Sequence, residues 1–460
     1  MNGGQADRLV IRFDRGSLVV SGWPRQQMNL PHYLIWDPRV QAHRCLAIHY
    51  RALVRRLIGE GRPYRDEARQ YPELSLPAGD LAALYPFQRE ALAAWERGKR
   101  GIVELPTGAG KTRLALQALC SVNRGSLIVV PTLDLLAQWC AVLQEGLGVS
   151  AGVVGGGSFD PRPVTVCTYA SAYRRGETFG DRFCLVIFDE CHHLSGGGYR
   201  RIPEVMIAPY RLGLSATVAW ADARRHALHP IIGPIVYKRS ITELRGRYLA
   251  NYRIETIRAE LSPAERKAYR EARRCYLEYA RKRGLTPTSA GMWQRFIFAA
   301  SGNPEGRRAL DAYYRQRQIA YAPQAKFAVL KELLHRHRAE RVLIFTNDNS
   351  TAYQISRDLL LPIITHQTPM GERRRALENF RTDRWPFLVT SRVLNEGVDL
   401  PMANVAVILS GSASVREHVQ RLGRILRKAP GKEAVLYEVI SRTPAEERVS
   451  RRRRQHDAYR

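Results

Sequence analysis

Two series of short apolar runs, each run followed by a helical pattern, constrain the fold more than any other feature of this sequence. The first series, between about residues 84 and 240, contains GIVEL, SLIVV, VTVCTY, CLVIF and RLGLSA. The second begins near residue 326 and contains RVLIF, PIITH, PFLVT, VAVIL and AVLYEVI. Strands that alternate with helices favour a doubly wound parallel sheet. We therefore expect an α/β chain with two such domains, over residues 80–243 and 326–445.

The segments around these two series predict smaller parts. LVIRFDRGSLVV, residues 9–20, has the pattern of a hairpin, with an Asp-Arg-Gly turn between two strands. Residues 1–75 are therefore expected to form a small N-terminal α+β module. The C-terminal residues 446–460 are rich in arginine and are expected to be a disordered basic tail.

Residues 244–325 are expected to be a connecting segment with a basic helical insertion. Eight Lys and Arg residues stand against three Glu in residues 264–283. A helix there would place five residues on one face: Ala268, Ala272, Cys275, Tyr276 and Tyr279. The charges fit either a solvated helix face or an insertion that grips nucleic acid.

The overall charge favours nucleic acid as a partner. The 72 Lys and Arg residues outnumber 43 Asp and Glu, which gives a net charge of +29. No run approaches the ~18 apolar residues of a membrane span, and the N-terminus lacks a signal-peptide pattern, so a cytoplasmic location without membrane contact is expected. Seven cysteines without a C-x-x-C pair are typical of reduced thiols. In Cys191-His192-His193, adjacent side chains cannot converge on a metal ion without distant partners.

The stretch LPTGAGKT predicts a phosphate-binding loop between a strand and a helix. Gly108 and Gly110 would free backbone N–H groups to point at an anion on the helix N-terminus. Lys111 would reach the β- and γ-phosphates, and Thr112 would offer its hydroxyl to Mg²⁺. Leu105 replaces the first glycine of the full pattern, so a chance match is the alternative. The predicted nucleotide-binding residues of the loop are Thr107, Gly108, Ala109, Gly110, Lys111 and Thr112.

Two carboxylates follow a buried strand in the same predicted sheet. Asp189 and Glu190 come directly after the apolar run of residues 185–188, at the strand end where a doubly wound sheet binds its ligand. Asp189 would hold Mg²⁺, and Glu190 would activate the attacking water. The alternative is an exposed acidic turn. Together with the loop, these carboxylates predict a site for a nucleotide triphosphate with its Mg²⁺.

A third pattern lies in the second α/β domain. EHVQRLGRILRK places Arg421, Arg424 and Arg427 in a predicted helical region, with the last two at i and i+3. Arginines directed at a γ-phosphate would stabilise the charge of the transition state. The alternative is an amphipathic helix with solvated arginines.

Nine stretches in order over residues 84–428 resemble the DExH-type superfamily 2 helicases, and among them the XPB-like DNA helicases. They are LYPFQREALAAW, LPTGAGKT, LIVVPTLDLLAQW, VTVCTYASA, VIFDECHHL, RLGLSATV, LIFTNDNSTA, LVTSRVLNEGVDLP and QRLGRILRK. The resemblance implies two RecA-like domains, with the helical insertion in the position of a thumb. The N-terminal module, residues 1–75, is similar to the short hairpin-bearing domain of archaeal and bacterial members, which implies that it interacts with DNA.

The resemblance also implies roles for particular residues. Gln88, beside Tyr85 and Phe87, would read adenine, and Ser215 and Thr217 would couple hydrolysis to domain movement. Gly397 and Asp399 would face both nucleotide and nucleic acid, and Gln420, Arg424 and Arg427 would form the arginine-finger element. Contacts with the nucleic-acid backbone are implied for Pro131, Thr132, Thr168 and Thr390.

These features predict an ATP-dependent DNA helicase or translocase. The resemblance implies 3′–5′ polarity and a role in DNA repair. Trp220-Ala221-Asp222 stands where XPB-like proteins carry Arg-Glu-Asp, which favours a duplex translocase that does not separate strands. An RNA substrate is a further alternative, as is an ATP-gated DNA-binding scaffold for a nuclease partner. Single-stranded, forked and duplex DNA are all candidate substrates, and a monomer is expected.

Overall fold

A computed structural model describes residues 9–25, 30–77, 84–196, 198–216, 227–285, 290–391, 403–410, 415–428 and 431–454. The chain divides into two compact units, with the boundary between Ser240 and Ile241. Within the described ranges, no helix is both long and apolar enough to cross a membrane.

The N-terminal module is a five-stranded sheet in the order β3-β4-β2-β1-β5 with one helix. The predicted hairpin is confirmed: β1 and β2 pair antiparallel around Arg15 and Gly16, both with positive φ. The elements are β1 (Leu9–Asp14), β2 (Ser17–Ser21), β3 (Ile35–Asp37), β4 (Ala42–Leu46), a 3₁₀ turn (Ala47–His49), α1 (Tyr50–Gly59) and β5 (Tyr64–Asp66).

This module packs against the domain that follows it. Ile207, which lies beyond the module in sequence, is part of the module's own buried cluster. A Cβ on Gly16 would lie 2.7 Å from Val205 Cβ, so the hairpin turn approaches the next domain closely. The backbone N–H of Gln70 also donates to the carbonyl of Asp181 at 3.0 Å. Module and first α/β domain therefore form one unit.

The first α/β domain is built on an eight-stranded sheet in the order β13-β6-β12-β11-β7-β10-β8-β9. Its pairs are parallel except β8 with β9. The strands are β6 (Arg100–Glu104), β7 (Ser126–Val130), β8 (Gly152–Gly155), β9 (Ser158–Asp160), β10 (Val164–Thr168), β11 (Leu185–Asp189), β12 (Tyr210–Ser215) and β13 (Ile235–Lys238).

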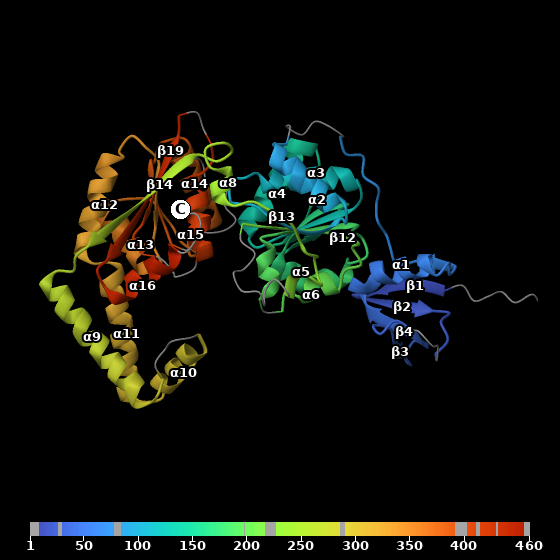
Figure 1. Ribbon diagram of the computed structural model, residues 1–460, viewed down its shortest axis with the longest axis horizontal. Helices are drawn as coiled ribbons and strands as arrows, with labels where there is room; N and C mark the ends of the chain where they lie inside the picture. The colour runs from blue at the N-terminus through green and yellow to red at the C-terminus, as the bar shows by residue number, and fades with distance from the viewer. Residues whose placement is uncertain are drawn as a thin grey trace, which may run out of the picture. The chain divides into compact units, whose positions relative to one another are not determined.

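Helices cover both faces of this sheet (Figure 1). Alternate residues of β7 and β11, such as Val129 and Phe188, share a buried cluster with Ala172 of α5 and Ile202 of α6. Helices α2, α3 and α4 lie over the opposite face (Figure 1). The five helices are α2 (Pro86–Glu96), α3 (Lys111–Val122), α4 (Leu133–Leu147), α5 (Tyr169–Arg175) and α6 (Arg201–Glu204).

The second α/β domain has a six-stranded parallel sheet in the order β14-β19-β18-β15-β17-β16. Its edge strand β14 (Asn251–Ala259) pairs with β19 over nine residues, so this sheet begins well before residue 326, where the sequence series starts. The remaining elements are α8 (Ile241–Leu244), α12 (Gln324–Arg336), β15 (Val342–Phe345), α13 (Asn349–Leu359), β16 (Ile363–Ile364), α14 (Met370–Arg381), β17 (Phe387–Thr390), β18 (Val405–Ile408), α15 (Val415–Gly423) and β19 (Glu433–Ser441).

Three helices form an arm on the second unit (Figure 1). They are α9 (Pro263–Lys282), α10 (Ala290–Ser301) and α11 (Pro304–Tyr321), and Ser262 and Glu265 cap α9 reciprocally. The predicted apolar face of α9 is correct for Ala272, Tyr276 and Tyr279, which are buried. It is wrong for Cys275, which is exposed. Tyr269 is buried instead, because its spacing from Tyr276 keeps it on the face that meets α11.

The expectation of a disordered C-terminal tail is wrong up to residue 454. Residues Pro444–Arg453 form α16. Glu446 accepts a hydrogen bond from buried Lys326 at 2.6 Å, and Arg453 pairs with Glu438 of β19 at 3.0 Å. Both pairs are almost fully buried, so they hold this helix on the sheet despite its basic composition.

Candidate nucleotide-binding site

The predicted phosphate loop joins β6 to α3 in the first domain. Gly108 and Gly110 have φ of 86° and 78°, the left-handed region in which glycine is unstrained. Gly110 is the N-cap of α3, and a Cβ there would lie 2.4 Å from the side-chain nitrogen of Gln88. Only glycine therefore fits this position, and the backbone N–H groups at the start of α3 are left to bind an anion.

The three polar side chains of the loop differ in their contacts. Lys111 Nζ donates to the carbonyls of Leu105 and Pro106 at 3.0 and 3.3 Å. The hydroxyl of Thr107 is buried and has no hydrogen-bond partner among the described residues. Leu105, at the position of the missing first glycine, is buried and its N–H donates to Ser215 O at 3.0 Å. Thr112 lies in the first turn of α3 and is partly exposed.

Gln88 connects α2 to the phosphate loop. Its side chain is fully buried; Nε2 donates to the carbonyl of Ala109 at 2.8 Å, and Oε1 accepts from Tyr85 N at 2.9 Å. The rings of Tyr85 and Phe87 are stacked with centroids 6.0 Å apart, and Tyr85 is 44% exposed. Gln88 thus supports the loop, while reading of adenine by this segment stays a prediction.

Asp189 ends β11 at the edge of the sheet where β6 passes into the phosphate loop. Its carboxylate accepts from Trp139 Nε1 at 2.9 Å and from Glu190 N at 3.0 Å. Burial raises the pKa of Asp189 to about 6, and the charge of Glu190 adds to the rise, while the Trp139 bond and Lys111 oppose it. An additional cation at this edge would therefore relieve an electrostatic cost.

Glu190 is the start of a line of polar contacts. Its φ of 48° is rare for a residue with a side chain. The Glu190 carboxylate lies 3.4 Å from His192 Nδ1, and the same nitrogen lies 3.3 Å from Ser215 Oγ. The acidic pair and the Ser-Ala-Thr segment are thus connected through one buried imidazole. Thr217 lies outside the described residues.

Sequence reasoning did not identify Trp139, His192 or Tyr169 as parts of this site. Trp139 lies on α4 and is 2% exposed, and Tyr169 donates its hydroxyl to the backbone carbonyl of Asp189 at 3.0 Å. A buried tryptophan usually donates its N–H to an acceptor, and this is the only signal that Trp139 offered. Its partner is 50 residues away in sequence, however, and no local pattern names it.

Three predicted nucleic-acid contacts lie at the carboxyl ends of neighbouring strands. Thr132 and Thr168 are the N-caps of α4 and α5, and each hydroxyl accepts from a backbone N–H of the first turn at 3.2 Å. Pro131, directly after β7, and Thr132 are partly exposed, whereas Thr168 is 7% exposed. β7 and β10 are adjacent, so the three residues share one edge of the sheet.

The predicted residues of the second domain are placed differently from one another. Thr390 ends β17 and is fully buried, so this conformation offers no Thr390 surface to a nucleic acid. Gln420 is 1% exposed on α15, and Arg424 is partly exposed. Gly397 and Asp399 lie outside the described residues.

The predicted helical region includes Arg421, but the prediction is wrong for Arg424 and Arg427, which lie beyond the helix. Helix α15 ends at Gly423, Arg424 lies in the turn that follows, and Arg427 is extended in a β-bridge with Leu249. The bridge to the segment before β14 ends the helical path. Arg421 is 2% exposed and donates to the carbonyl of Thr346 at 3.4 Å, so it holds the domain core.

The donor set at the loop fits a nucleotide better than a metal ion alone. In the described part of the chain no three His, Cys, Asp or Glu side chains gather to hold a metal. Asp189 and Thr112 offer two oxygens, and Mg²⁺ in such sites takes its other ligands from water and substrate phosphates. The loop N–H groups and Lys111 match those phosphates.

Comparisons with known proteins agree with this geometry. Residues 81–219 match the type III restriction enzyme res subunit family, residues 325–429 the helicase conserved C-terminal domain, and residues 11–68 the xeroderma pigmentosum group B helicase damage recognition domain. The chain is 40% identical over 92% of its length to DNA 3′-5′ translocase XPB2 of Sulfurisphaera tokodaii, 96% of which is covered. The chain belongs to the XPB-like family of superfamily 2 helicases.

More distant relatives are longer than this chain. It is 30% identical, over 78% of its length, to DNA 3′-5′ helicase XPB of Mycobacterium tuberculosis, of which it covers 61%. It is 26% identical, over 89% of its length, to the transcription and DNA repair factor IIH helicase/translocase subunit XPB/SSL2 of Saccharomyces cerevisiae, of which it covers 47%.

A solved structure confirms the predicted fold class of two RecA-like domains. The Pyrococcus furiosus Hef helicase domain superposes with a TM-score of 0.53 at 18% identity, and the match covers 79% of this chain and 97% of that one. Resemblance at this identity concerns the fold alone.

Proposed function

We propose that this chain is an ATP-driven motor that moves along DNA with 3′–5′ polarity. Family membership supports ATP use, and the names of the relatives support DNA and the direction of movement. The observation that carries the proposal is the carboxyl edge of the first sheet, where the loop from β6 to Lys111 and the end of β11 with Asp189 and Glu190 lie on either side of β12. A role in DNA repair is proposed by analogy with the factor IIH subunit of yeast.

The loop and the two carboxylates are assigned separate tasks. The N–H groups of residues 107–112 and the Lys111 ammonium would bind the phosphates, and Thr112 and Asp189 would hold Mg²⁺. When bound, Mg²⁺ and ATP supply charge neutralisation and the bond to be broken. Glu190 would accept a proton from the attacking water, and its strained backbone fixes the carboxylate at the end of β11.

Hydrolysis would be reported to the rest of the chain by two routes. His192 contacts both Glu190 and Ser215, so a change at the carboxylate can shift the Ser-Ala-Thr segment that includes Thr217. Gln420, Arg424 and Arg427 of the second domain are proposed to approach the γ-phosphate when ATP is bound, together with Gly397 and Asp399. Binding of ATP would thereby select a closed arrangement of the two domains.

DNA contacts are proposed along the carboxyl edges of both sheets. Pro131, Thr132 and Thr168 surround helix N-termini, which attract backbone phosphates without reading bases. Thr390 belongs to this proposal only if the chain around it moves, since it is buried here. A monomer in the cytoplasm, with a nuclease as partner, completes the proposal.

Translocation on duplex DNA without strand separation is the second candidate. It is favoured by the name of the Sulfurisphaera relative, a translocase, and by the res-subunit family that matches the first domain. A scaffold that only clamps DNA is disfavoured, because Lys111, Asp189 and Glu190 are all present.

The test is DNA-stimulated ATP hydrolysis by Lys111→Ala beside the parent chain. We expect hydrolysis to fall to background, because the phosphates lose their cation. Arg113→Ala is the matched control: Arg113 is an exposed cation two residues further along α3 and should leave turnover unchanged. Parental turnover in Lys111→Ala would disprove the nucleotide site.

A second measurement identifies the nucleic acid on which the chain acts and distinguishes strand separation from translocation. ATP hydrolysis is compared with single-stranded DNA, duplex DNA, forked DNA and RNA. Unwinding of the fork is then measured beside displacement of a third strand from a triplex. Fork unwinding supports a helicase, and triplex displacement without unwinding supports a translocase. Stimulation by RNA alone would contradict DNA as substrate.

A further inference from the structure

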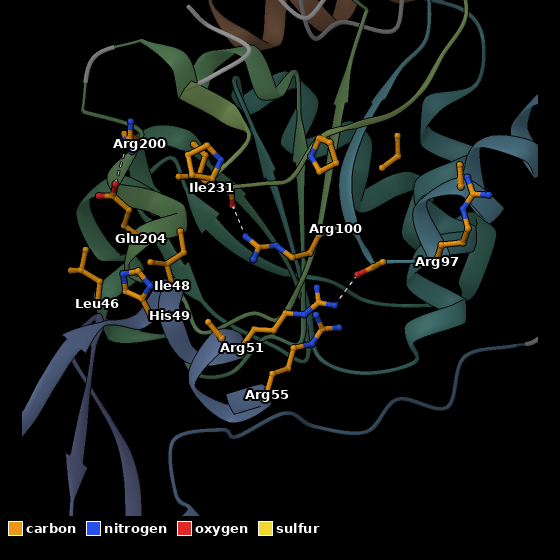
Figure 2. Close-up of a pocket in the computed structure, with 16 residues that line it drawn as sticks. Leu46, Ile48, His49, Arg51, Arg55, Arg97, Arg100, Arg200, Glu204 and Ile231 are labelled. Carbon is orange, nitrogen blue, oxygen red and sulfur yellow. Dashed lines mark hydrogen bonds and ion pairs between the residues drawn. The ribbon is translucent and has the colours of Figure 1, made fainter. Parts of the chain in front are cut away.

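Arginines gather at the other edge of the first sheet, where its strands begin. Arg100 opens β6 and pairs in register with Arg211 at the start of β12. Arg51 and Arg55 reach the same place from α1 of the N-terminal module, and Arg97 follows the end of α2. Figure 2 shows Arg51, Arg55, Arg97 and Arg100 around one cavity of about 990 Å³.

Carboxylates do not neutralise this arginine cluster (Arg51, Arg55, Arg97, Arg100 and Arg211). Among the described residues that line the cavity the acidic one is Glu204, which is paired with Arg200 at 3.0 Å. Within the same described ranges none of the five clustered guanidinium groups has an ion-pair partner. The cluster therefore carries a concentrated positive charge.

Backbone carbonyls orient three of these arginines. Arg51 donates to the carbonyl of Gly98 at 2.9 Å, and Arg211 and Arg100 donate to that of Ile231 at 2.7 and 3.4 Å. Carbonyls satisfy the donors but carry no net charge. Burial, with repulsion from Arg51 and Arg55, lowers the pKa of Arg100 to about 10. The fold thus holds like charges together, which an anionic ligand would relieve.

The cluster continues into a second cavity of about 790 Å³. Arg51, Arg55 and Arg97 line both cavities, so the two form one groove along α1 between the module and the first domain. The second cavity adds Lys99, together with two arginines that face carboxylates: Arg69 lies 3.4 Å from Asp66, and Arg124 lies 2.6 Å from Glu73. Glu96 also lines this cavity, so the excess of positive charge there comes from Arg51, Arg55, Arg97 and Lys99. A row of cations of this extent suits several anionic groups in succession better than a single one.

We infer that this groove binds successive backbone phosphates of duplex DNA, at the sheet edge opposite to the nucleotide site. Guanidinium forks match phosphate oxygens in geometry and charge, and phosphates recur along a strand at regular spacing. The identity of the polymer rests on the proposed function. The groove would keep DNA on the chain independently of ATP, because its walls belong to one unit.

The test uses Arg55→Gln/Arg97→Gln, because both side chains are exposed and their loss should not unfold the chain. Affinity for a fluorescent duplex is measured without nucleotide over a series of salt concentrations. We expect the slope of log affinity against log salt to become shallower by about 2, since each lost phosphate contact removes roughly 0.9. Arg55→Lys/Arg97→Lys keeps both charges and should retain most of the slope.

The matched control is Arg15→Gln/Arg338→Gln, which removes the same charge from two exposed arginines outside both cavities. We expect the parental slope. An unchanged slope in Arg55→Gln/Arg97→Gln, or an equal loss in the control, would overturn the inference. If the parent chain binds no DNA at all, the proposed function is wrong. This result differs from an unchanged slope in the variant, which would contradict the groove alone.

Free anions and acidic peptides are separate arms of the test. In the Lys111→Ala background, thermal stabilisation by tripolyphosphate and by poly-glutamate is measured with and without Arg55→Gln/Arg97→Gln. Loss of either stabilisation while the DNA slope stays parental would assign the groove to that ligand and overturn the DNA assignment. A shallower salt dependence of DNA binding in Arg55→Gln/Arg97→Gln supports the DNA assignment, whether or not tripolyphosphate or poly-glutamate also binds.

Discussion

The two RecA-like domains share one fold but bury their charged side chains differently. In the first domain, Asp189 and Glu190 lie side by side at the end of β11, two like charges at the edge of the sheet. In the second domain, Lys326 pairs with Glu446 at 2.6 Å in the interior. Burial, with the charge of Glu190 added to it, raises the pKa of Asp189 to about 6, whereas Lys326 and Glu446 are neutral as a pair.

This difference distinguishes a charged pair that binds a ligand from a charged pair that holds the fold together. A like-charged pair at a strand end costs stability that a bound cation relieves, which is typical of functional sites. A buried pair of opposite charges, here called a closed pair, adds little net stability. Removing one partner is costly, because the remaining charge stays buried. Lys326 and Glu446 come from elements 120 residues apart, so their pairing fixes the C-terminal helix on the second domain.

The largest predicted effect is on this closed pair. Lys326→Met leaves Glu446 buried without its cation and should lower the free energy of unfolding by about 3–5 kcal/mol. This loss of stability is measured by chemical denaturation, from the unfolding transition of the second domain. Lys326→Met/Glu446→Gln keeps an acceptor for the N–H of Ser441 and should regain most of the loss. Equal instability of the single and double variants would show that packing, not charge, holds α16.

A smaller effect is expected at the acidic pair. Trp139→Phe removes the 2.9 Å bond to Asp189, a bond to a charged group worth about 1.5–3 kcal/mol. We expect roughly a tenfold higher Mg²⁺ concentration for half-maximal ATP hydrolysis, because the carboxylate loses its orientation.

Trp95→Phe is the matched control for Trp139→Phe. Trp95 is also buried, and its N–H donates at 3.0 Å to a backbone carbonyl, that of Arg211. Its loss should destabilise the chain without changing the Mg²⁺ requirement. A similar shift in Mg²⁺ requirement for both variants would mean that Trp139 acts through stability alone.

Local chemistry explains which features were predictable. The β1–β2 hairpin, the phosphate loop and the strand before Asp189 depend on short stretches whose residues act on their neighbours. Gly110 is an example: its left-handed conformation follows from the loop in which it stands. The alternation of apolar runs likewise predicted both parallel sheets.

Features that depend on distant partners were not predictable. β14 is a strand because it pairs with β19, which lies 174 residues or more further along the chain. Arg427 is extended because it bridges to Leu249, and the helical spacing after Gly423 could not show that. The arginine groove likewise needs α1 and the start of β6 side by side, an arrangement that no local spacing predicts.

Lys432 is an exception to the closed pairs of the second domain, and it gives the smallest predicted effect. Its ammonium is buried without a hydrogen-bond partner in the described part of the chain. Burial, followed by repulsion from Arg341 and Arg427, lowers the pKa of Lys432 from 10.5 to about 8. Above pH 10.5 the amine is neutral and its burial costs no folding free energy. As the pH falls through about 8, the buried amine takes up its charge and this part of the stability is lost.

Lys432→Met removes this titration and should raise the melting temperature by a few degrees at pH 7. The gain should shrink as the pH rises from 8 towards 10.5, because the parent chain then carries a neutral amine in both its folded and unfolded states. Lys331→Met, on the exposed face of α12, removes the same charge without burial and should show no such trend. A gain in melting temperature that does not change with pH would mean that Lys432 acts through packing. The prediction that its buried charge destabilises the second domain would then be wrong.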